Sequence, residues 1–104
     1  MEICILFLTC TNMKEADKIT RTLLEKRLIF CAKRFPVSSS YFWKGKRNSS
    51  KEVLLIMDSL RDNFEKVRKE VAKIHSYKTF VLLSSPVIQT TVEVENWIKQ
   101  ELRS

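Results

Sequence analysis

The apolar positions of the chain follow two patterns, one continuous and one with helical spacing. Residues 3–8 form a continuous apolar run, which is typical of a strand that is covered on both faces or central in a sheet. Asn12 and Glu15 follow it with the spacing of a capping box, a pair that satisfies free N–H groups at a helix start. The apolar positions with helical spacing are Ala16, Ile19, Leu23 and Leu24. The pattern predicts a strand and an amphipathic helix that ends near Arg27.

The next stretch predicts two strands joined by a turn. Residues 28–35 begin the second strand, which Pro36 interrupts. Because proline has no N–H to donate to a ladder, it indicates a bulge, a bend or the edge of a sheet. The chain stays extended as far as Gly45, and residues 45–50 are predicted to turn it before a third strand begins at Lys51. A connection this short between two long strands favours an antiparallel hairpin.

A second helix and a fourth strand follow. Ser59 and Asp62 are expected to open the helix, and His75 and Tyr77 to close it. The apolar stripe of this helix consists of Phe64, Val67, Val71 and Ile74. Residues 79–87 then predict a strand with a proline near its end.

A last helix is predicted near the C-terminus, where Thr90 and Glu93 have the spacing of a second capping box. The positions expected to face inward are Val94, Trp97, Ile98 and Leu102. The complete order is β-α-β-β-α-β with an extra C-terminal helix. This is the α+β ferredoxin-like plan, an antiparallel sheet with two helices on one face. No linker or repeat divides the 104 residues, so we expect a single domain over residues 1–104.

Composition and charge limit which partners and which cell compartment the sequence favours. Nineteen Lys and Arg against twelve Asp and Glu give a formal net charge of +7, which favours anionic partners such as nucleic acid, although charge also serves solubility. The three cysteines, Cys4, Cys10 and Cys31, have no framework spacing, which indicates reduced thiols and a cytoplasmic protein. No apolar stretch approaches the ~20 residues that span a bilayer, so no membrane partner is expected.

The ferredoxin-like plan hosts many functions, so the residues of the site must decide between them. An RNA-recognition motif needs aromatic residues on its central strands; the first strand offers Phe7, whereas residues 51–59 contain none. The positive charge supports this alternative and the missing aromatic residues oppose it, so it stays open as a minor one. A phosphatase of this fold needs a glycine-rich loop with an arginine, and no Ser/His/Asp or Cys/His order is evident. A heavy-metal chaperone needs a Cys-x-x-Cys pair, which Cys4 and Cys10 do not form. We therefore expect a binding protein rather than an enzyme.

Cys31 and His75 are the remaining candidates for soft metal ligands. Two ligands are fewer than the about four that a tight zinc site takes, unless subunit symmetry multiplies them. A lone cysteine is more often a small buried hydrophobic residue. A histidine at the end of a basic helix is more often a cation that interacts with the helix dipole.

Residues 25–45, EKRLIFCAKRFPVSSSYFWKG, contain a cysteine strand, a proline, an aromatic run and a glycine in a specific order. The positions concerned are Leu28, Cys31, Pro36, Ser40, Tyr41, Trp43 and Gly45. Five later positions belong to the same pattern: Glu52 before an aliphatic strand, His75, Tyr77, Pro86 at a strand end, and Trp97. Together they resemble the CutA family of divalent-cation tolerance proteins, over a match that runs from about residue 8 to residue 102.

The resemblance implies a tight homotrimer of ferredoxin-like subunits, similar in plan to PII signalling proteins. It also implies a role connected with copper or another divalent cation, for which Cys31 and His75 would be the ligands. The hairpin would extend the sheet into a neighbouring subunit and contribute aromatic anchors, including Phe42, to the interface. The residues implied for the pocket or the interface are Tyr41, Trp43, Glu52 and Tyr77.

Several pocket positions depart from the family pattern. Ser76 stands in place of a proline, Val81 of a glutamate, Lys33 of an asparagine and Asp58 of a lysine. A lysine close to Cys31 is unfavourable for a bound cation, although it favours the thiolate. The second hypothesis is therefore a diverged trimer that takes an anionic ligand, nucleic acid or a protein partner. The cations that would bind an anion are Lys33, Arg34, Arg68, Lys69 and Lys73, for which simple solvation is the plainer explanation.

Overall fold

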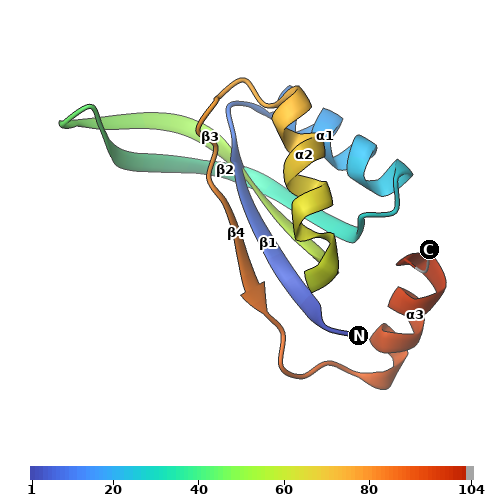
Figure 1. Ribbon diagram of the computed structural model, residues 1–104. Helices are drawn as coiled ribbons and strands as arrows, with labels where there is room; N and C mark the ends of the chain where they lie inside the picture. The colour runs from blue at the N-terminus through green and yellow to red at the C-terminus, as the bar shows by residue number, and fades with distance from the viewer. Residues whose placement is uncertain (103–104) are drawn as a thin grey trace.

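The computed structural model describes residues 1–102 and has an α+β architecture with one four-stranded antiparallel sheet (Figure 1). The strand order is β2-β3-β1-β4, and α1 and α2 cover one face of the sheet. This order confirms the predicted ferredoxin-like plan. The elements are β1 (Ile3–Cys10), α1 (Met13–Glu25), β2 (Ile29–Trp43), β3 (Lys46–Leu60), a 3₁₀ turn (Arg61–Asn63), α2 (Phe64–Ile74), β4 (Leu82–Pro86) and α3 (Val92–Leu102).

The core lies between the helices and one face of the sheet. On β1 every second side chain, from Cys4 to Cys10, is buried, whereas Ile5 and Phe7 on the opposite face are only half-buried. Of the two alternatives predicted for this apolar run, the central position in the sheet is confirmed, because β1 lies between β3 and β4. Within residues 1–102 only one face of the strand is covered by helices, because α1 and α2 lie on one side (Figure 1). The second face is apolar and carries no helix, which makes it a surface that requires explanation.

The β2–β3 hairpin is longer than the sequence predicted. Both strands have 15 residues, and the turn consists of Lys44 and Gly45 alone, not of residues 45–50. Both turn residues have positive φ, 51° and 76°, the conformation that a tight hairpin turn needs and that glycine adopts without strain. β1 pairs with β3 only as far as Val53. Residues 37–52, called the arm below, therefore form a two-stranded ribbon that projects from the body (Figure 1).

Pro36 lies inside β2 and does not end it. Its backbone opposes Val53 in the ladder, and β2 is one of the two edge strands of the sheet. An edge strand tolerates proline because the missing N–H faces outward, so the edge alternative is confirmed. The bulge lies elsewhere, between Ile29 and Cys31.

Four element ends differ from the prediction, wholly or in part. Ser59 does not open α2 but is buried in β3, where its hydroxyl donates to the carbonyl of Leu28. His75 closes α2 as predicted, because it is the C-cap residue after Ile74 and has extended backbone, whereas Tyr77 lies beyond the helix. The last helix is capped by Thr91, whose hydroxyl accepts the N–H of Val94, and not by Thr90. β4 is shorter than predicted, because the segment before Leu82 serves the site described below.

α3 packs beside the end of the sheet at which β1 begins (Figure 1). Ile98 and Leu102 are buried, as predicted. Trp97 stays half-exposed and meets Phe30 edge-to-face at a centroid distance of 5.2 Å. No helix within residues 1–102 is long and apolar enough to cross a membrane.

Thr20 on the core side of α1 offers a test of the packing. Its hydroxyl is buried and has no hydrogen-bond partner among the described residues. A buried polar group without a partner costs about 1–3 kcal/mol, so Thr20→Val should raise the free energy of unfolding by about 1 kcal/mol. Urea denaturation would measure it, with the partly exposed Thr22→Val as the control that changes little. A destabilised Thr20→Val variant would show that the hydroxyl does have a partner.

Candidate functional site: a cysteine, a glutamate and a histidine

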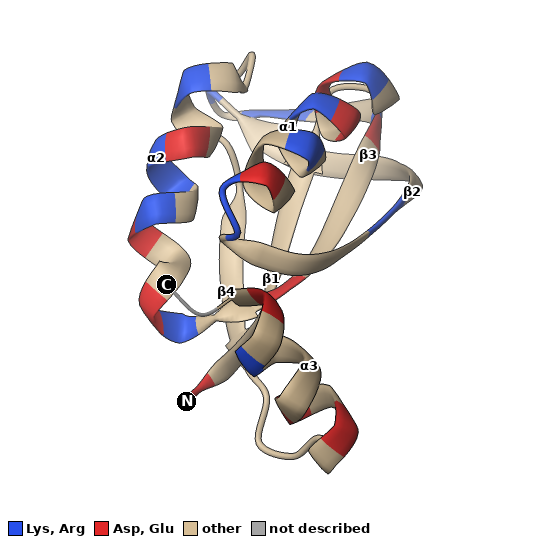
Figure 2. Cartoon of the chain, turned by 90° about the vertical axis from the view of Figure 1, so that its right-hand side faces the viewer, with Lys and Arg blue, Asp and Glu red and all other residues tan. Residues whose placement is uncertain are grey.

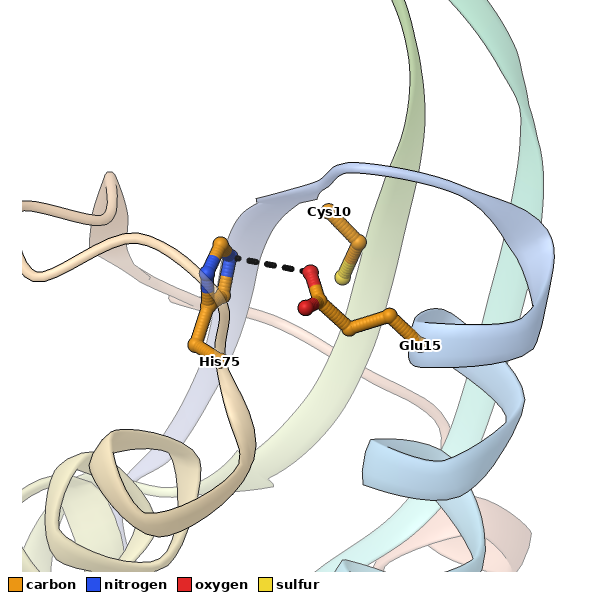
Figure 3. Close-up of side chains that lie close together, drawn as sticks. All are labelled: Cys10, Glu15 and His75. Atoms are coloured by element: carbon orange, nitrogen blue, oxygen red, sulfur yellow. Dashed lines mark ion pairs between the residues drawn. The ribbon is translucent and has the colours of Figure 1, made fainter.

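Three chain segments meet where β1 ends. β1 ends at Cys10, α1 begins after Asn12, and α2 ends just before His75. Figure 3 shows the side chains of Cys10, Glu15 and His75 pointing toward one another from these segments. One thiol sulfur, one carboxylate oxygen and one ring nitrogen lie within 4.8 Å of one another.

Glu15 holds this junction together through its carboxylate. One oxygen accepts the N–H of Thr11 at 3.0 Å, and the other accepts the N–H of Ser76 at 2.8 Å. Partial burial opposes ionisation, but these two backbone donors and the Ser76 hydroxyl outweigh it and lower the pKa of Glu15. The predicted cap is confirmed, because the Asn12 side chain accepts the N–H of Glu15 at 2.9 Å.

Both ring nitrogens of His75 form hydrogen bonds. Its Nε2 lies 2.8 Å from the carbonyl oxygen of Thr9, which can only accept, so Nε2 carries the proton. Its Nδ1 accepts the N–H of Tyr77 at 3.0 Å and therefore carries none. The ring is neutral in this arrangement and stacks on Phe80. The contact of 3.6 Å with Glu15, dashed in Figure 3, becomes an ion pair only if the ring is protonated.

Cys10 is a buried thiol with no exposed surface. Burial, together with the nearby carboxylates of Glu15 and Glu52, raises the pKa of Cys10 to about 12. At neutral pH the sulfur therefore keeps its proton unless a cation replaces it.

The donor set is chemically suited to a soft or borderline cation, but only after a change of protonation. Thiolate, imidazole and carboxylate are ligands that zinc and copper accept, and the spacing of the three atoms suits one ion. Binding requires that Cys10 lose its proton and that His75 free a ring nitrogen from Thr9 or from Tyr77. In the structure as it stands, the same three side chains act as a structural junction.

The structure places the candidate ligands Cys31 and His75 apart within one chain. Cys31 opposes Asp58 on β3, and Asp58 opposes Ile5 on β1. His75 contacts Thr9, four residues further along β1, which is about 13 Å at strand spacing. That pair of ligands stays a prediction that would need residues from more than one subunit.

The four residues predicted for the pocket or the interface form two separate pairs, one beside the junction and one on the arm. The hydroxyl of Tyr77 donates to the buried carboxylate of Glu52 at 3.1 Å, and burial together with this bond raises the pKa of Tyr77. This pair adjoins the junction, because the Tyr77 N–H also bonds His75. Tyr41 and Trp43 lie on the arm and are 40% and 53% exposed.

The cations proposed for an anion site are mostly neutralised by carboxylates. Lys33 pairs with Asp58 and its ammonium lies 3.6 Å from the Cys31 sulfur. Arg34 pairs with Asp17. On α2, Arg68 pairs with Glu65 and Lys73 with Glu70, and basic and acidic residues alternate along the helix (Figure 2). Of the five, Lys69 alone has no ion pair within residues 1–102. The arrangement weakens the hypothesis of an anion site on this surface.

Sequence reasoning missed two members of the junction. Glu15 was interpreted only as part of a helix cap, although its carboxylate reaches a loop 61 residues later. Cys10 was considered only in a pair with Cys4. The available signal was the position of Cys10 at the end of a central strand, immediately before a capped helix.

Comparison with known proteins decides the family. The family model described as CutA1 divalent ion tolerance protein matches residues 4–101. The chain belongs to this CutA1 family. The divalent-cation tolerance protein CutA of Archaeoglobus fulgidus is 33% identical over 95 residues, which cover 91% of this chain and 93% of that protein. The human protein CutA is 32% identical over 99 residues, 94% of this chain but 55% of the human protein.

Solved CutA structures show the same fold. The periplasmic divalent cation tolerance protein CutA from Archaeoglobus fulgidus superposes with a TM-score of 0.95 at 31% identity, covering 97% of this chain and 99% of that one. A CutA1 mutant from Pyrococcus horikoshii superposes with a TM-score of 0.92 at 26% identity, with the same coverage. The family model and the relative from Archaeoglobus fulgidus are both named for divalent-cation tolerance, which supports a general role in divalent-cation tolerance.

The Glu15 carboxylate gives a prediction with a defined pH dependence. Glutamine at position 15 keeps one acceptor oxygen, so one of the two N–H donors loses its partner, and Glu15→Gln should lower the free energy of unfolding at pH 7 by about 1.5 kcal/mol. The pKa of Glu15 is lowered in the folded state. The stabilisation is therefore present above the ordinary value of 4.5 and is lost as the pH falls through the native value.

Urea unfolding of Glu15→Gln and of the wild type at pH 7 and at pH 3 would measure both effects. The difference between the two proteins should shrink at the lower pH. The exposed Glu25→Gln on the same helix is the matched control and should change stability by less than about 0.5 kcal/mol. A difference that is equal at the two pH values would contradict the assigned role of the carboxylate.

Proposed function

We propose that this CutA1-family protein acts in divalent-cation tolerance as a homotrimer that binds copper or another divalent cation at Cys10, Glu15 and His75. The observation that carries the metal part is the convergence of sulfur, oxygen and nitrogen donors within 4.8 Å. The proposal replaces Cys31 by Cys10 as the sulfur ligand, because Cys10 adjoins His75 within the same chain. Free cysteines throughout the described residues support a reducing compartment such as the cytoplasm.

The thiol at Cys10 makes the proposed binding selective for soft cations. Oxygen ligands alone would suit magnesium or calcium, whereas a thiolate favours copper and zinc. The family name connects the chain with divalent cations in general, and the sulfur is the feature of this site that narrows the choice. The protein contributes ligands and a buried environment, and no catalytic group is required.

Metal titration tests the site. Calorimetry of the reduced protein with Cu²⁺ and with Zn²⁺ should give saturable binding that is lost in Cys10→Ser and in His75→Gln. Cys31→Ser is the matched control, since its thiol lies beside Lys33 and away from the junction, and it should bind as the wild type does. Circular dichroism establishes that each variant is folded. Binding retained in both Cys10→Ser and His75→Gln would refute the site.

The pH dependence of the same titration provides a second test. Because the Cys10 pKa is about 12, the cation must displace the thiol proton at neutral pH. The apparent affinity should therefore fall about tenfold for each pH unit lowered between pH 8 and pH 7. Zn²⁺ titrated at the two pH values in equal ionic strength would measure it, and an affinity independent of pH would exclude the thiol as a ligand.

The trimer is supported by surfaces that one chain leaves open. The helix-free face of the sheet presents Phe35 and Leu83, which are 43% and 59% exposed, beside half-buried aliphatic side chains. β2 and β4 are edge strands, and the arm extends the β2 edge beyond the body (Figure 1). An arm that pairs with the next subunit makes a head-to-tail contact, and such contacts close into a ring when the rotation allows.

Tyr41 and Trp43 are the proposed anchors of that contact. They alternate along β2 and therefore lie on one face of the arm. Trp43→Ala should destabilise each contact by about 2 kcal/mol or more, as truncation of a buried interface aromatic does. Light scattering after gel filtration should show three chain masses for the wild type and a smaller, concentration-dependent mass for the variant. A wild type that elutes as one chain mass would refute the trimer.

A further inference from the structure

The arm carries much of the positive charge of the chain. Residues 37–52 contain four cations, Lys44, Lys46, Arg47 and Lys51, and one acidic residue, Glu52. Glu52 is buried at the base of the arm against Tyr77. No ion pair among residues 1–102 includes any of the four cations. This differs from the helices, where the predicted anion-binding cations mostly face carboxylates.

The strand register divides the arm into two faces. Phe42 opposes Arg47, Ser40 opposes Ser49, and Ser38 opposes Lys51. Directly opposed residues share a face, so these six side chains form one surface, called the serine face below. The hydroxyls of Ser40 and Ser49 lie 3.3 Å apart across it, in agreement with the register. Tyr41 and Trp43 lie on the opposite face, which the proposed trimer uses.

The serine face combines two kinds of group that recognise the same polymer. Phe42 is 77% exposed, more than any other aromatic side chain among the described residues. An exposed aromatic ring offers a stacking surface to a base, and cations along the strands attract the phosphates. Three serine hydroxyls between them are further donors to phosphate oxygens. We propose that the serine face of the arm binds single-stranded nucleic acid.

Single strands fit this surface better than the other polyanions do. A duplex keeps its bases stacked inside, so Phe42 would have no base to stack on. An anionic membrane would be met by the tip of the arm, whereas Arg47 and Lys51 are spaced along the ribbon, about 13 Å apart, with serines between them. The proposal goes beyond cation tolerance and does not depend on the metal site.

The charge part is tested by fluorescence anisotropy of a labelled 12-nucleotide oligothymidylate over a series of salt concentrations. Each phosphate contact contributes about 0.7 to the slope of log affinity against log salt for a single strand. The double variant Arg47→Ser/Lys51→Ser should therefore reduce the slope by about 1.4 and weaken binding at low salt. The matched control Lys14→Ser/Lys18→Ser removes the same charge from exposed positions of α1 and should leave the slope unchanged. An equal loss in both double variants would overturn the proposal in favour of unspecific attraction to the net charge.

The stacking part is tested by Phe42→Ser, which should weaken binding about tenfold or more with the salt slope unchanged. Phe42→Tyr keeps the ring and should restore the affinity. Gel filtration of each variant must give the wild-type mass, which separates this effect from a loss of the trimer. The result that would overturn the proposal is wild-type affinity in Phe42→Ser. Binding to phosphatidylserine vesicles or to a 12-base-pair duplex that equals or exceeds binding to the single strand would overturn it as well.

Discussion

The carboxylate of Glu15 accepts one N–H from Thr11, at the start of α1, and another from Ser76, 61 residues later and just past the end of α2. These two bonds join the starting turn of one helix to the loop that leaves the other. The imidazole of His75 lies beside the thiol of Cys10 because this loop is held against the end of β1. The chain then reaches β4 only at Leu82, which explains why that strand is short.

The candidate ligand atoms of Cys10, Glu15 and His75 are already occupied by a proton or by a hydrogen bond, and this lowers the affinity that a cation can reach. Each donor already has a partner or a proton, so a cation gains only the difference between its own bonds and those that it replaces. Such competition weakens binding of every cation by the same amount. Hard cations gain little from a thiolate, so they do not overcome this cost and bind weakly. Copper and zinc bind a thiolate strongly enough to displace the proton and the hydrogen bonds. The structural role and the proposed binding role of these side chains are thus compatible.

The sequence predicted the order of elements well because apolar periodicity is a local signal. The helix start at Asn12 and the inward residues Ile98 and Leu102 followed from spacing alone. The length of the hairpin was not predictable in this way, since Ser49 and Ser50 look like turn residues and become strand only through pairing with Ser40 and Ser39. The junction could not be predicted from the sequence for a related reason. Its members are distant in sequence, and Glu15 already had a sufficient local role.

The arm also has a consequence for solubility. A projecting two-stranded ribbon exposes backbone donors and acceptors along its outer edges, and such edges can pair with identical edges on other molecules. Charged side chains, lysine above all, are a common protection against this, because like charges brought together repel. Lys44, Lys46, Arg47 and Lys51 place that repulsion on the segment of the chain that lacks a third strand. The charge repulsion between these cations therefore opposes the edge-to-edge pairing of arms from different molecules, which is the step that leads to fibres.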